Sequence, residues 1–101
     1  MAAYIVMTRL RTHDPHGLVA YGEVAQTAPW SSARVVATTK AGKWKPLEGD
    51  APDVVTVIRF DNWDDALGWY DSPEYQAARQ HRLPACDVTA VIIETDEPGA
   101  S

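Results

Sequence analysis

Histidines and carboxylates are the side chains of this sequence whose types best fit acid–base chemistry. Histidine gives and takes protons near neutrality because its unperturbed pKa is ~6.5. We predict that His81 or His16 moves a proton. Glu48 or Asp50 is predicted to orient that histidine through a hydrogen bond. The alternative for both histidines is a surface role, because one follows a helix start signal and the other lies near a predicted helix end, where the helix dipole alone favours a cation.

An oxyanion that develops in such a reaction needs a hydrogen-bond donor, and Arg79 or Tyr21 is predicted to supply it. Aromatic side chains would form a flat apolar wall for an aromatic or polyketide-like substrate. Two of them, Trp30 and Trp44, lie in predicted loops, where burial is not forced. Others follow helical spacing and are better explained as core or dimer packing. The substrate-binding candidates are Tyr21, Trp30, Trp44, Trp69 and Tyr70.

Other chemistries find little support in the sequence. His13, His16 and a carboxylate straddle a proline and match no metal-ligand motif. Cys86 is the single cysteine, and a lone thiol beside a strand is typical of inert packing. There is no phosphate-binding loop, dinucleotide fingerprint or Gly-x-Ser-x-Gly turn. We therefore predict neither a metal nor a cofactor.

Length and charge limit the class of protein. The 101 residues fit one domain, and 9 Lys+Arg against 14 Asp+Glu give a net charge of −5. Such a charge repels nucleic acid and anionic lipid, so neither is an expected partner. Apolar runs fall far short of the roughly 20 residues that cross a bilayer, and no leader pattern opens the chain. We expect a cytoplasmic protein without disulfides.

The order of the predicted elements is strand, helix, strand, strand, helix, strand. β-branched and apolar residues indicate strands over 4–10, 34–40, 54–60 and 87–94. Asp14 and Pro15 start a first helix that ends before Pro29, and the glycines and prolines of 41–53 indicate a long hairpin loop. A second helix follows Asp61 or Asn62 as cap. It restarts with a kink at 72–74 and runs to about residue 82.

This order predicts an α+β, ferredoxin-like split β-α-β domain over 1–95, with a flexible tail over 96–101. The four strands form an antiparallel sheet in the order 4-1-3-2, with two helices on one face. The end of the first strand, the start of the first helix, the hairpin loop and the end of the second helix then meet at one end of the sheet. Most titratable candidates gather there.

Alternation along the strands leaves an unexpected second apolar face. In the third strand Ile58 and Phe60 point to one face, whereas Val55 and Val57 point to the other. The fourth strand is likewise apolar on both faces. Because the helices cover only one side, the other would expose several hundred Å² of apolar surface. We therefore predict a homodimer whose sheets cover each other.

The residues over 69–76, Trp-Tyr-Asp-Ser-Pro-Glu-Tyr-Gln, together with Leu-Glu-Gly-Asp over 47–50 and Asp14-Pro15, closely resemble the 1330 domain-of-unknown-function family of the dimeric α/β-barrel superfamily. The resemblance spans about 4–94. It implies a ferredoxin-like protomer and a dimer whose two sheets close a barrel. The sequence departs from the family's pattern at Leu18 and Arg59, at 31–33 and in the added Trp44, which indicates a specialised pocket wall and mouth.

The resemblance carries over no catalytic residue, because the family has no agreed activity. Superfamily neighbours include cofactor-free monooxygenases, lactone isomerases and polyketide cyclases with a pocket between sheet and helices. This favours a cofactor-independent enzyme that acts on an apolar or aromatic small molecule by proton transfer, as isomerase, cyclase or monooxygenase. The alternative is a dimer that binds a small molecule or serves in assembly without catalysis.

Overall fold

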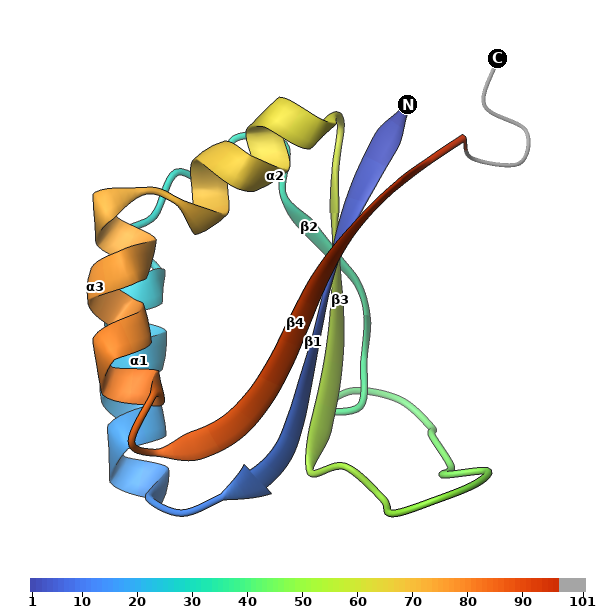
Figure 1. Cartoon of the computed structure of the whole chain (residues 1–101), viewed down its shortest axis with the longest axis vertical. Coiled ribbons are helices and arrows are strands. Elements are labelled where there is room, and N and C mark those ends of the chain that lie inside the picture. Colours follow the sequence, from blue (N-terminus) through green and yellow to red (C-terminus); the bar gives the residue numbers. More distant parts are fainter. Residues whose placement is uncertain (97–101) are drawn as a thin grey trace.

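The computed structural model describes residues 1–96 of the chain. Seven elements follow one another: β1 (Ala2–Thr12), α1 (Pro15–Ala25), β2 (Arg34–Thr38), β3 (Val54–Phe60), α2 (Trp63–Tyr70), α3 (Pro73–Arg82) and β4 (Cys86–Thr95). Figure 1 shows the sheet nearly edge-on with all three helices on the same side. Of the predicted tail over 96–101, residues 97–101 lie outside the described part.

The sheet has the predicted topology. Its strand order is β2-β3-β1-β4, which is the order 4-1-3-2 read from the other edge, and every neighbouring pair is antiparallel. In the register, Ile5 of β1 lies opposite Ile58 of β3 and Ile92 of β4. The ferredoxin-like arrangement is therefore confirmed, with β1 and β3 as the two central strands.

Short polar side chains start the helices. Asp14 accepts a hydrogen bond from the His16 amide before α1, and Asn62 accepts one from the Asp65 amide before α2. The predicted restart is a true break: Ser72 caps a separate helix that begins at Pro73. The predicted second helix is thus two helices, α2 and α3, which lie at a clear angle in Figure 1.

The strands differ from the prediction mainly in length. β1 extends two residues beyond each predicted end, because it is hydrogen-bonded on both sides and follows its partners to their ends. β4 gains one residue at each end. β2 ends at Thr38 rather than residue 40, since the chain turns there and the Lys40 amide donates to Thr38 Oγ1.

Aromatic rings fill the core between the helices and the sheet. Trp69, Tyr75 and Phe60 are the largest fully buried side chains. The Trp69 ring centroid lies 4.3 Å from that of Tyr75 and 5.8 Å from that of Phe60. Because α2 supplies Trp69, α3 supplies Tyr75 and β3 supplies Phe60, this cluster joins three elements. Such rings bury the largest area per residue and hold the angle between the two helices.

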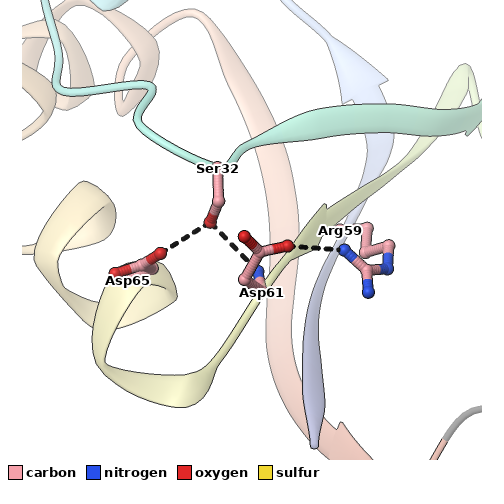
Figure 2. Close-up of polar contacts among 4 residues, drawn as sticks. All are labelled: Ser32, Arg59, Asp61 and Asp65. Atoms are coloured by element: carbon pink, nitrogen blue, oxygen red, sulfur yellow. Dashed lines mark hydrogen bonds and ion pairs between the residues drawn. The ribbon is translucent and has the colours of Figure 1, made fainter. Parts of the chain in front are cut away.

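A polar network joins the beginning of β2 to the first turn of α2 (Figure 2). The Ser32 hydroxyl donates to Asp65 Oδ2 over 2.7 Å and accepts from the Asp61 amide over 3.0 Å. The Asp61 carboxylate in turn pairs with Arg59 Nη1 at 2.9 Å. The hydroxyl of Ser32 therefore holds the chain entering the edge strand β2 against the turn between β3 and α2.

The face of the sheet opposite the helices is apolar, as the alternation predicts. In its central rows Val6 lies between Val57 and Val91, and Thr8 lies between Val55 and Thr89. Val91 is 54% exposed in the single chain. We call this surface, with Tyr4 and Ile93, the open face. It is mainly apolar, although Arg59 and Thr8 also belong to it, and soluble proteins usually cover apolar patches of this kind.

Two glycines allow a test of how α1 is held. A Cβ on Gly17 would lie 2.9 Å from the Cβ of Ala85, whereas one on Gly68 in α2 would meet nothing within 4 Å. Gly68→Ala should therefore raise the free energy of unfolding by about 1 kcal/mol through helix propensity. Gly17→Ala should lower it despite the same propensity gain. Urea unfolding measures both, and equal stabilisation by the two would show that α1 does not need this close approach.

Candidate functional site

A cavity of about 270 Å³ lies between the helix-facing side of the sheet and α1. All four strands and all three helices contribute to its lining. The lining is mostly apolar, with Met7 and Ile58 on the sheet and Leu18 on α1. The lining residues that can stack on a ligand, donate to it or carry charge include Arg9, Tyr21, Trp30, Trp69, Arg82 and Cys86.

Helical spacing aims the polar residues of α1 and α3 at this space. Tyr75, Ala78 and Arg82 are the buried residues of α3, and they recur at intervals of three and four along one face of that helix. Tyr21 lies on the inner face of α1, where it packs against the core. The backbone of α1 lies close to that of α3 but farther from the strands. The space between α1 and the sheet is therefore available for a cavity.

Two tyrosines meet at the inner end of the cavity. The hydroxyl oxygens of Tyr21 and Tyr75 are 2.9 Å apart, and the rings meet edge to face with centroids 6.0 Å apart. The Tyr75 hydroxyl also donates to Met7 Sδ over 3.8 Å. Either tyrosine can donate in the hydrogen bond between them, so when Tyr75 donates to Tyr21, the Tyr21 proton is available to a group in the cavity.

Burial raises the pKa of Tyr21 far above its ordinary value, and the neighbouring Tyr75 raises it further. Arg82 acts in the opposite direction but more weakly. The Arg82 Cζ atom lies 5.7 Å from the centroid of the Tyr21 ring. Tyr21 therefore stays neutral at physiological pH, so it can share hydrogen bonds but cannot serve as a phenolate base.

Cys86 forms part of the same end of the cavity. Burial raises the pKa of its thiol, while the charges of Arg82 and Arg9 lower it by less. Its Sγ donates to the carbonyl oxygen of Arg82 over 3.8 Å. A buried, protonated thiol of this kind is a poor nucleophile and contributes to packing.

Three of the sequence-predicted site residues line the cavity: Tyr21, Trp30 and Trp69. Trp30 stacks at a tilt on Trp69 with centroids 5.2 Å apart, so together they form an aromatic wall. Tyr70 lies elsewhere. Its ring is 5.2 Å from that of Tyr75, and it lines a separate groove of about 290 Å³ beside β4.

The predicted acid–base residues do not line the cavity. His16 and His81 are exposed, although the structure does bring them to one place: a Cβ on Gly17 would be 3.3 Å from the carbonyl oxygen of His81. Glu48, Asp50 and Trp44 belong to the exposed segment 41–53, which stands on the side of the sheet away from the helices (Figure 1). Arg79 is half-buried on α3 and does not line the cavity.

Sequence reasoning missed Arg9 and Arg82 as site residues, although signals for both were present. Arg9 has the same strand parity as Ile5 and Met7, which places it on the helix-facing side. Arg82 continues the buried stripe of α3. Arg9 and Arg59 lie at opposite ends of the sheet. Arg59 pairs with Asp61, whereas Arg9 has no ion pair within residues 1–96.

The described residues also bear on metal sites and membrane spans. Within the described part of the chain, no three His, Cys, Asp or Glu side chains are grouped so that they could hold a metal ion. None of the helices of residues 1–96 has the length and apolar character needed to cross a membrane.

A family model described as a domain of unknown function (DUF1330) matches residues 2–96. The chain belongs to this family. None of the curated proteins matches it. The resemblance found in the sequence is thereby confirmed, and the DUF1330 match covers every element of the fold.

Solved structures share the fold of this DUF1330 protein. The RPA0582 protein of Rhodopseudomonas palustris, of unknown function, has a TM-score of 0.67 and 17% identity over 96% of this chain and 84% of its own. A dimeric ferredoxin-like protein of Thermobifida fusca, also of unknown function, has a TM-score of 0.63 and 19% identity over 94% and 92%. SnoaB, a cofactor-independent oxygenase of Streptomyces nogalater, has a TM-score of 0.59 and 9% identity over 96% and 95%. At these identities the likeness shows the fold.

The raised pKa of Tyr21 predicts a loss of stability in alkali. Its phenol ionises near pH 10 in the unfolded chain and only above that in the folded one. The stabilisation is therefore complete below pH 10 and is lost as the pH rises beyond it. Between pH 10 and 11, unfolding free energy should fall more steeply in the wild type than in Tyr21→Phe, by up to about 1.4 kcal/mol per pH unit. Parallel urea-derived slopes would contradict a buried neutral phenol.

Proposed function

We propose that this protein is a homodimeric enzyme that acts without a cofactor on an apolar or aromatic small molecule held between α1 and the sheet. The observation that carries the proposal is the cavity itself, which has an aromatic wall of Trp30 and Trp69 and a polar end at Tyr21 and Arg82. A mostly apolar space with a few converging polar groups is typical of small-molecule sites. The shared fold of SnoaB, a cofactor-independent oxygenase, is consistent with such chemistry.

The chemistry proposed is proton transfer with stabilisation of an oxyanion. The neutral Tyr21 hydroxyl and the positive charge of Arg82 lie together at the inner end of the cavity. A substrate that loses a proton from carbon places negative charge on its oxygen, and fixed donors and charges in a dry site stabilise that charge. We retain His81 or His16 as the proton acceptor, since both lie where α1 begins and α3 ends.

One observation favours the alternative of a dimer that binds a small molecule without turning it over. Among residues 1–96, no histidine and no carboxylate lines the cavity. A general base must come within hydrogen-bond reach of the proton that it removes, directly or through one water. The two functions therefore differ in whether bound ligand exchanges a proton at carbon.

The open face supports the homodimer. At its β4 edge Val91 and Ile93 are 54% and 48% exposed, next to Val6 and Tyr4 of β1. A second copy offers an identical, self-complementary apolar face, which is how two-fold dimers commonly form. Burying the patch also adds to the small core of a domain this size. The Thermobifida fusca protein with the same fold is described as dimeric.

A charge on the open face should separate the two copies. Val91→Asp would bury a carboxylate in the proposed interface, so native mass spectrometry at micromolar concentration should find a monomer where the wild type is a dimer. Val19→Asp is the matched control, because Val19 is 62% exposed on α1, on the other side of the molecule. A monomeric wild type, or an intact Val91→Asp dimer, would contradict the proposed interface.

Hydrogen–deuterium exchange at carbon distinguishes the enzyme from the binding protein. The probe is 2-tetralone, an aromatic ketone whose C–H bonds next to the carbonyl exchange through an enolate. The wild type should accelerate their deuteration in D₂O, followed by NMR, and Tyr21→Phe should reduce that acceleration by about 10²–10³-fold, the usual effect of losing one oxyanion donor.

Histidine variants complete this measurement. His81→Asn and His16→Asn should identify the proton acceptor, while His13→Asn is the control because that imidazole lies 3.1 Å from Asp87 Oδ1 on the outside. If 2-tetralone binds and no exchange is accelerated, the protein is the non-catalytic binding dimer. Full activity in both His81→Asn and His16→Asn would remove the histidines from the mechanism.

A further inference from the structure

The charged side chains that line the cavity are positive, although the net charge of the protein is −5. Arg9, Lys40 and Arg82 line it, whereas none of the carboxylates of residues 1–96 does. Taking the small-molecule site proposed above as its basis, we propose that the ligand carries an anionic group, a carboxylate or an enolate, that binds between Arg9 and Arg82. A cavity of one sign with apolar walls focuses the field on such a ligand.

Arg82 is buried without a carboxylate partner. Its side chain is 7% exposed, and its Nε has no hydrogen-bond partner. No carboxylate of the described chain lies within ion-pair distance of it. A buried guanidinium is costly unless it is paired, and Arg cannot shed its proton to avoid that cost. An anion in the cavity would supply the opposite charge that this group lacks, together with a hydrogen-bond acceptor for its Nε.

Arg9 completes the arrangement from the sheet. It lies opposite Val54 and Val88, so its neighbours in the sheet are apolar, and its Nε is also buried and unpartnered. Arg9 and Arg82 line the same cavity as Cys86, and the charges of both act on its thiol, as do those of Asp53 and Asp87. Guanidinium groups present several donors in a plane and bind carboxylates with two parallel hydrogen bonds.

The two carboxylates near this end of the sheet have partners other than Arg9 and Arg82. Asp53 accepts a hydrogen bond from Thr12 Oγ1 over 2.8 Å. Asp87 lies 3.1 Å from His13 Nε2. Both carboxylates are on exposed residues at the same end of the sheet as Arg9, yet neither forms an ion pair with Arg9.

The rest of the cavity indicates what the anion is attached to. The aromatic wall of Trp30 and Trp69 and the hydroxyl of Tyr21 lie along the same space as the arginines. Its volume of about 270 Å³ is near the lower end, ~300 Å³, of ordinary small-molecule pockets. The ligand class is therefore a compact aromatic acid or enolate, with its ring on the tryptophans and its charge on the arginines.

Two probes that differ mainly in charge test this inference. 2-Naphthoate and its neutral amide, 2-naphthamide, have the same ring and nearly the same shape. Isothermal titration calorimetry of the full-length protein at pH 7 should show naphthoate binding at least 10-fold more tightly. Arg82→Gln should remove most of that preference while naphthamide affinity is kept, and Arg9→Gln should do the same, which guards against poor folding of either variant.

The control is Arg11→Gln, which removes one positive charge from an exposed site on β1 outside the cavity. If naphthamide binds as tightly as naphthoate, the inference is wrong and the aromatic site stands. If neither probe binds the folded protein, the small-molecule site itself is wrong and the inference falls with it. An equal loss of preference in Arg11→Gln would show that only the general charge matters, and it would overturn the assignment to Arg9 and Arg82.

Discussion

The alternation of side chains along the strands is the constraint on which this structure depends. Successive residues of a strand point to opposite faces, and β1, β3 and β4 carry apolar residues on both. Three helices from one chain cover one face only, as Figure 1 shows. The covered face becomes the floor of the cavity, and the open face becomes a surface suited to a second copy. Both functional features thus follow from one property of the sheet.

The cavity arises from how the helices are held against that sheet. At one end, Trp69, Tyr75 and Phe60 fill the space between helices and strands. Farther along, α1 packs on α3, and a close approach at Gly17 fixes its start. The cavity lies there, between α1 and the helix-facing side of the sheet. Arg82 reaches this space because it continues the buried face of α3.

Most of the fold could be predicted because its signals are local. Asp14-Pro15 and Ser72-Pro73 mark helix starts through short-range capping, and β-branched runs mark the strands. The candidate site was predicted less well. Its aromatic wall of Trp30 and Trp69 was among the candidates, but the histidines were chosen for their pKa, and they lie on the outside. A residue type suited to proton transfer says nothing about which way a helix is rotated.

The sequence by itself determined the element order, the two apolar faces of the sheet and the family. These depend on neighbouring residues and on a period of two, which can be read without knowing what packs where. Only the tertiary structure decided which polar groups share a space. Arg9 and Arg82 are 73 positions apart, and their place in the lining of one cavity depends on the pairing of β1 with β4 and on the packing of α3 against α1. Those are set by the packing of the whole chain, because burial of a side chain is a property of its neighbours in space.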